Sequence, residues 1–317
     1  MVASKKKNVA KKCLRTAALI VLYLYLVRFE YSANRKLAAK YDFRSAELLL
    51  IFQSTAAILV LYVVSKSKQR NIPRLNLVDI STFLPFAILC FISAKCGILV
   101  FKSRGIPETS PFKTCLFPFS LEVEKVLFPT NVFRIARVSS LTAVLLSFLC
   151  YIRGGEMAYG WLQCVVSRVT YAVFVNGVKK ILIDAEYSSL HIFYGIYLAL
   201  LVISVLVGTV SFSVFDGLKG PPWMRGDFVY TLMSSVLFGI GTFFNQVYLT
   251  YFTSPTFVVV LTYVAQESWN LGMGKMYPFS CNTFVLVAMF IALISFLFDL
   301  IHESLYDLGK KEMSSLP

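Results

Sequence analysis

The sequence predicts an all-α membrane protein with about ten transmembrane helices. Of its 317 residues, 57% are hydrophobic and 15% are charged, and its mean hydropathy is +0.69. Soluble domains carry about 25% charged residues, whereas a membrane span needs about 20 predominantly apolar residues. Apolar runs of this kind recur from one end of the chain to the other. We therefore expect a multi-pass protein with no room for a soluble catalytic domain.

The expected spans follow one another with short connections. The first is preceded by the basic segment KKKNVAKK. Arg28 and Glu30 stand where a signal peptide would carry a small-residue cleavage site, so we interpret this run as a retained helix. The spans cover residues 14–33, 45–65, 79–101, 111–133, 138–152, 157–178, 187–212, 228–251, 254–274 and 281–303.

The net charge of +14 is interpreted through the topology of the chain. Lysine and arginine accumulate on the cytosolic side of membrane proteins, so a nucleic-acid partner is not expected. The basic segment 1–13 is assigned to the cytosol, and an even number of spans then places the tail 304–317 there as well. The remaining cationic surplus is suited to an anionic substrate.

Short sequence words recur at nearly one offset along the chain. Thr109-Ser110-Pro111 returns as Thr253-Ser254-Pro255, 144 positions later, and Asn34 matches Asn176 at an offset of 142. Two separate stretches sharing one offset predict a duplication of the chain.

The duplication divides the chain into two five-helix repeats, residues 14–155 and 156–303. Because five is odd, the second repeat inserts upside down relative to the first. Inverted repeats are typical of secondary transporters, in which two similar halves open a midplane site alternately to either face.

The two Thr-Ser-Pro words also predict helix starts. Serine and threonine cap helix N-termini, and proline suits the first turn. In opposed halves, Thr109, Ser110 and Pro111 would flank one gate, and Thr253, Ser254 and Pro255 the other. The alternative is that each word is a plain helix cap.

Ionisable side chains inside the spans are candidate substrate contacts, because such groups are costly in a bilayer and normally face a cavity or a partner. Lys95 lies in the third span and Lys125 in the fourth. Both would offer a cation to a phosphate. Glu122 lies three residues before Lys125 on one helical face and would hold it when the site is empty. The alternative is that Glu122 and Lys125 only satisfy each other.

The ninth and seventh spans supply further candidates. Tyr263, Gln266 and Asn270 share one helical face and offer an aromatic ring and two amides, which suit a base and a sugar. Phe193 and Tyr194 are either lipid-facing or stacking residues.

Catalytic and metal-binding patterns are absent from the sequence. It has two histidines, and its seven cysteines are scattered without a Cys-x-x-Cys pair. We therefore expect neither an enzyme nor a cofactor or metal site.

The chain resembles the nucleotide-sugar transporters of the drug/metabolite transporter superfamily. Phe193-Tyr194 resembles the start of the Phe-Tyr-Asn-Asn motif of the GDP-mannose type, and Lys95 and Lys125 resemble its cationic positions. After a start resembling Ser254-Pro255-Thr256, that family has Gly-Ala-Leu-Asn-Lys. Here residues 262–266 read Thr-Tyr-Val-Ala-Gln, so the asparagine and lysine are replaced.

The resemblance implies a 5+5 inverted-repeat architecture that exchanges a cytosolic nucleotide-sugar for a lumenal nucleoside monophosphate. It further implies a Golgi or endoplasmic reticulum membrane, lipid contacts, and a homodimer as one expected assembly. Two alternatives stay open: a transporter of another phosphorylated metabolite, and a non-transporting structural or trafficking relative.

Overall fold

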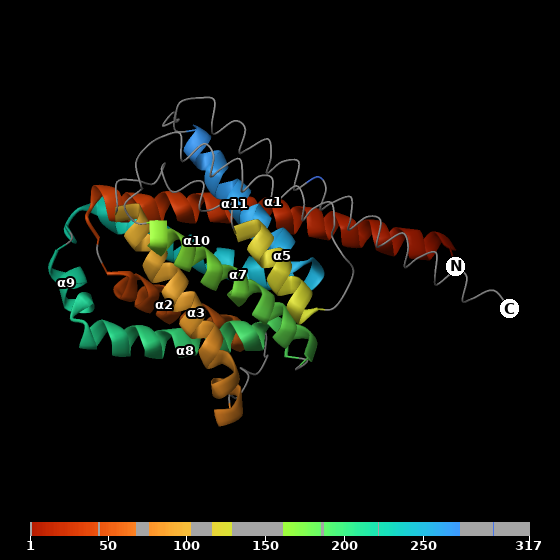
Figure 1. Ribbon diagram of the computed structural model, residues 1–317, viewed down its shortest axis with the longest axis horizontal. Coiled ribbons are helices and arrows are strands. Elements are labelled where there is room, and N and C mark those ends of the chain that lie inside the picture. Colours follow the sequence, from red (N-terminus) through yellow and green to blue (C-terminus); the bar gives the residue numbers. More distant parts are fainter. Residues whose placement is uncertain are drawn as a thin grey trace.

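The computed structural model describes residues 2–43, 45–67, 76–102, 116–128, 161–184, 187–220, 222–272 and 294. Regular structure in these residues is entirely helical (Figure 1). The helices are α1 (Val2–Lys40), α2 (Ala46–Ser67), α3 (Leu77–Lys102), α5 (Leu116–Leu127), α7 (Trp161–Asp184), α8 (Ser189–Val210), α9 (Ser213–Lys219), α10 (Gly226–Phe252) and α11 (Pro255–Gly272).

Helices long and apolar enough to cross a membrane occur in both halves of the chain. Five qualify in the described residues: Leu14–Lys40, Ala46–Lys66, Val78–Phe101, Ser189–Val210 and Gly226–Phe252. The shorter apolar segment Pro255–Gln266 follows them. The expectation of an all-α, integral multi-pass membrane protein is therefore confirmed.

The expected spans can be compared one by one with the helices. The spans expected at 14–33, 45–65, 79–101, 157–178, 187–212, 228–251 and 254–274 correspond to α1, α2, α3, α7, α8, α10 and α11, and α5 occupies the middle of the span expected at 111–133. The spans at 138–152 and 281–303 lie outside the described residues, apart from helical residue 294. The short helix α9 was not expected. It follows Phe212, whose φ of 56° turns the chain sharply after α8.

Helix packing follows a regular exchange pattern. The most extensive contacts join α1 to α10, α3 to α7, and α2 to α8. If α1, α2, α3 and α5 are exchanged one for one with α7, α8, α10 and α11, the contact between α1 and α10 becomes the contact between α7 and α3. In the same way, the contact between α5 and α7 becomes the contact between α11 and α1. The pairs α2–α8 and α5–α11 map onto themselves. In Figure 1, α1 and α8 run along opposite edges of the bundle.

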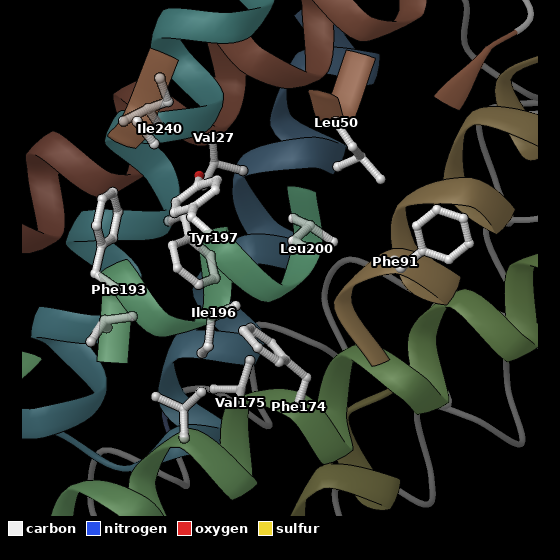
Figure 2. Packing of buried hydrophobic residues seen from close by; sticks show 14 of the residues in the cluster. Val27, Leu50, Phe91, Phe174, Val175, Phe193, Ile196, Tyr197, Leu200 and Ile240 are labelled. Carbon is white, nitrogen blue, oxygen red and sulfur yellow. The ribbon is translucent and has the colours of Figure 1, made fainter. Parts of the chain in front are cut away.

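An aromatic cluster holds α7, α8 and α10 together. The Phe243 ring of α10 lies 4.9 Å from Tyr197, 5.6 Å from Phe193 and 5.7 Å from Phe174, measured between ring centroids. Figure 2 shows Phe193 and Tyr197 on α8 among the surrounding buried residues. Edge-to-face and offset ring pairs of this kind add stability beyond the area they bury.

Gly195 permits the closest helix approach in this region. A Cβ at Gly195 would lie 2.2 Å from the ring of Phe83, which is fully buried. Membrane helices associate chiefly through close packing, for which small residues are required. Gly195 therefore lets α8 lie directly against α3.

Gly195→Ala is expected to destabilise the protein by about 2 kcal/mol, because the buried Phe83 ring has no space into which it can move. Thermal unfolding in detergent would measure the loss. Gly226→Ala is the matched control, since nothing lies within 4 Å of a Cβ at that position. Equal melting temperatures for the two variants would contradict the packing described here.

Candidate functional site

A cavity of about 210 Å³ lies in the interior of the helix bundle. Helices from both halves of the chain form its walls. Its apolar lining includes Val27, Leu50, Phe174, Tyr197 and Leu200, which are labelled in Figure 2. Its polar lining consists of Glu30, Tyr31, Asn34, Gln53, Ser93, Ser167, Arg168, Tyr171, Thr242, Gln246, Thr262 and Gln266. An apolar cavity with a few converging polar groups is the usual form of a small-molecule site.

Arg168 brings a positive charge into this cavity from α7. Its Nη2 donates a hydrogen bond of 2.9 Å to Oε1 of Gln266 on α11. Its Nε is buried and has no hydrogen-bond partner within the described residues. A buried guanidinium donor without an acceptor is costly. An anionic group of a ligand is the natural acceptor for it.

Glu30 brings a negative charge into the same cavity from α1. Asn34 hydrogen-bonds its side chain. A Cβ at Gly239 would lie 3.4 Å from Oε1 of Glu30 and 2.4 Å from Nε2 of Gln53, so these two side chains converge on the bare backbone of α10. The cavity therefore contains both signs of charge.

A cluster of hydroxyl groups ties three helices together beside the cavity. The Tyr23 hydroxyl lies 2.7 Å from Oγ1 of Thr262 and 3.2 Å from the Tyr171 hydroxyl. The Tyr171 hydroxyl lies 2.9 Å from Oγ1 of Thr262. These contacts join α1, α7 and α11, which carry Glu30, Arg168 and Gln266 respectively. The cluster therefore fixes the walls that position the charged groups.

A second link holds α3 against α7 beside the cavity. The Ser93 hydroxyl donates to the Ser167 carbonyl at 3.0 Å, and the Ser167 hydroxyl donates to the Ser93 carbonyl at 2.9 Å. Gly97 lies beside this link, with Oγ of Ser167 3.6 Å from the position of a Cβ. Both hydroxyls are thus satisfied by the neighbouring helix.

Lys95, expected to contact a phosphate, does not line the cavity. Its Nζ lies 2.7 Å from Oε1 of Glu47 on α2, and the Glu47 side chain is only 2% exposed. Lys95 also lies over the Phe91 ring, 5.8 Å from its centroid. The structure thus gives Lys95 a carboxylate partner between α2 and α3.

Glu122 and Lys125 lie on exposed parts of α5, and neither lines the cavity. The neighbouring Glu124 is the α5 carboxylate that contacts another helix. Its Oε2 accepts hydrogen bonds from Oγ of Ser254 at 2.9 Å and from the backbone N–H of Thr256 at 3.1 Å. Glu124 therefore binds the N-terminus of α11.

Lys179 of α7 binds the other side of the same joint. Its Nζ donates to the carbonyls of Thr250, Tyr251 and Thr253, at 2.9, 2.9 and 3.2 Å. An ammonium group at a helix C-terminus and a carboxylate at a helix N-terminus both complement the helix dipole. We call Lys179 and Glu124, with the α10–α11 connection at 253–254, the α10–α11 clamp.

The second Thr-Ser-Pro word forms this connection. The Thr253 hydroxyl donates to the Leu249 carbonyl at 2.7 Å, and α11 begins at Pro255, directly after Ser254. The first word, Thr109, Ser110 and Pro111, lies outside the described residues.

Lys179→Met is expected to destabilise the protein by about 2 kcal/mol, because three carbonyl groups at the end of α10 lose their donor. Thermal unfolding in detergent would measure the loss. Lys180→Met is the control, since Lys180 is exposed and pairs with Asp184 at 3.5 Å, one turn away on the exposed face of α7. Equal stabilities for the two variants would show that the clamp contributes nothing.

The remaining predicted residues fall in different places. Gln266 lines the cavity and accepts from Arg168. Phe193 is buried in the aromatic cluster, Tyr194 is half-buried, and neither lines the cavity. Tyr263 is 2% exposed and lies in the core of the bundle. Asn270 belongs to α11, but its side chain is outside the described set.

Arg168, Glu30 and Gln53 line the cavity but are not among the residues predicted from the sequence. Arg168 carried a usable signal, because it is the one Asp, Glu, Lys or Arg between 157 and 178. Glu30 lies near the end of the first span, where a charge is ordinarily explained by proximity to the membrane surface. Gln53 is an uncharged polar residue in the second span, and its sequence context does not distinguish a cavity wall from a helix contact.

Comparison with known proteins adds information on the fold. No family model and no curated protein matches this chain. Among solved structures, 25 chains match. One of them, described only as a crystal structure of a protein, matches with a TM-score of 0.63 and 13% sequence identity, covering 89% of this chain and 96% of the other. The chain therefore shares, over nearly its whole length, the fold of a solved protein.

Proposed function

We propose that the protein is a secondary transporter that exchanges a cytosolic nucleotide-sugar for a lumenal nucleoside monophosphate by alternating access. The observation that carries the proposal is the half-buried Arg168, which lines the cavity and whose buried Nε has no acceptor in the described residues. An ionisable group at such a place in a membrane protein marks a substrate path. Its charge suits a phosphate.

The packing pattern supports a 5+5 inverted-repeat architecture. The helix contacts largely map onto themselves when α1, α2, α3 and α5 are exchanged with α7, α8, α10 and α11. The same exchange pairs α1, which carries Asn34, with α7, which carries Asn176, and these two residues match at the offset of 142. Two halves with interchangeable contacts are suited to alternating access. On this proposal the membrane is that of the Golgi or the endoplasmic reticulum, with both termini cytosolic.

The volume of the cavity favours a second candidate, a transporter of a smaller phosphorylated metabolite. Pockets for drug-sized ligands span about 300–1,000 Å³, and this cavity holds about 210 Å³. A nucleotide-sugar therefore requires the cavity to widen, whereas a short sugar phosphate does not.

Counterflow in liposomes tests both candidates. Purified protein would be reconstituted, and separate vesicle batches preloaded with GMP, UMP, CMP, AMP or inorganic phosphate. Uptake of labelled nucleotide-sugars and of labelled triose phosphate would then be followed. Nucleotide-driven uptake of a nucleotide-sugar supports the proposal. Phosphate-driven uptake of triose phosphate alone supports the second candidate.

Silence across the whole panel would contradict both candidates, provided that the reconstituted protein is folded. That result would favour the remaining alternative, a non-transporting structural or trafficking relative.

A further inference from the structure

We infer that Glu30 binds the nucleobase of a ligand whose anionic group contacts Arg168 in the same cavity, and that Glu30 selects guanine among the nucleobases. The inference rests on the proposed function and specifies its substrate class. It starts from the observation that one cavity holds a cationic and an anionic side chain.

The two charges do not neutralise each other in this structure. Arg168 donates to Gln266, and Glu30 is bound by Asn34. No ion pair between Arg168 and Glu30 occurs among the ion pairs of the described residues. Separate charges in a poorly solvated cavity are each costly. A ligand with an anionic group at one end and N–H donors at the other would satisfy both.

The surroundings of Glu30 define the ligand group that fits there. Gln53 and Gly239 lie beside the carboxylate, and the absence of a side chain at Gly239 leaves Oε1 of Glu30 within 3.4 Å of where a Cβ would be. Tyr197 and Phe243 line the same cavity. Aromatic faces stack with any nucleobase, so the carboxylate must supply the discrimination.

A carboxylate accepts hydrogen bonds and donates none. Guanine presents N1–H and N2–H₂ side by side, so it can donate to both oxygens of one carboxylate. Uracil presents a single N–H between two carbonyl oxygens, which repel a carboxylate. Adenine and cytosine present an amino group next to a bare ring nitrogen. Guanine alone therefore matches both oxygens of Glu30.

The first test uses the native protein and needs no substitution. Dissociation constants for GMP and IMP would be measured by titration of the full-length protein in detergent. IMP lacks only the 2-amino group. We expect GMP to bind at least about tenfold more tightly than IMP, since one specific base contact provides that much discrimination. Equal affinities would overturn the inference.

The second test uses Glu30→Gln, which keeps the size of the side chain but replaces one acceptor oxygen by a donor. The preference for GMP over IMP should fall to less than about threefold. Asp184→Asn is the control, because Asp184 lies exposed at the end of α7, outside the cavity. A GMP preference that survives in Glu30→Gln would overturn the inference.

The counterflow panel separates failure of this inference from failure of the proposed function. Uptake driven by UMP and a UDP-sugar would leave the transporter proposal standing and exclude guanine selection. Folded protein that binds no nucleotide would overturn both.

Discussion

Arg168→Ala is expected to reduce nucleotide binding and exchange by about 100-fold, because a buried charged contact to the substrate phosphate is removed. Arg168→Lys should retain part of the activity, since it keeps the charge but lacks the planar donor set that reaches both Gln266 and a ligand. Titration of GMP or UMP and counterflow in liposomes would measure both effects. Arg225→Ala, at an exposed position before α10, is the control.

The stability of the empty protein separates a substrate contact from a structural one. If Arg168 binds an anionic substrate, its removal eliminates a buried Nε donor that has no acceptor in the described residues, and the melting temperature of the ligand-free protein should not fall. A large drop in melting temperature, together with unchanged affinity in the surviving fraction, would assign Arg168 a structural role. Normal transport by Arg168→Ala would remove the main support of the proposed function.

Lys95→Met is expected to lower the free energy of unfolding by about 2 kcal/mol, because it leaves Glu47 buried without its cation. The double variant Lys95→Met/Glu47→Gln should recover most of that loss. Equilibrium unfolding in mixed detergent micelles would provide the comparison. This loss in free energy of unfolding is smaller than for a fully buried ion pair, because the Lys95 side chain is 39% exposed.

The same variant also tests the role that the sequence suggests for Lys95. A phosphate contact would lose transport at unchanged stability. Because Lys95 pairs with Glu47 in the structure, the single variant should instead lose stability. The double variant should then recover both stability and transport. If the double variant is fully stable but still does not transport, Lys95 contacts the substrate.

The helices were predictable because a bilayer requires long apolar runs, and the chain shows them plainly. The site was predictable only in part, because residue type does not reveal which way a helix faces. Lys95 and Arg168 are both cations within apolar spans, yet packing turns Lys95 toward Glu47 and Arg168 into the cavity. The distinction depends on seven helices packing together, and no local pattern contains it.

In the fourth span, too, the sequence does not reveal which side chain contacts another helix. Glu122 and Lys125 form a plausible pair by spacing, but Glu124 is the residue whose direction on α5 brings it to α11. Gln266, predicted from the ninth span as a substrate contact, lines the cavity and accepts a hydrogen bond from Arg168. Sequence periodicity groups residues by face, and only the neighbouring helices decide what each face meets.

The α10–α11 clamp changes what the surroundings of this turn must provide. At most helix ends, water satisfies the backbone groups that have no partner within the helix. Here one ammonium group takes three carbonyls and one carboxylate takes an N–H and a hydroxyl. The two side chains thus take the place of water as hydrogen-bond partners for residues 250–256. A turn whose backbone groups are hydrogen-bonded by side chains does not need water from the membrane surface. For this reason α11 can follow α10 after only two residues.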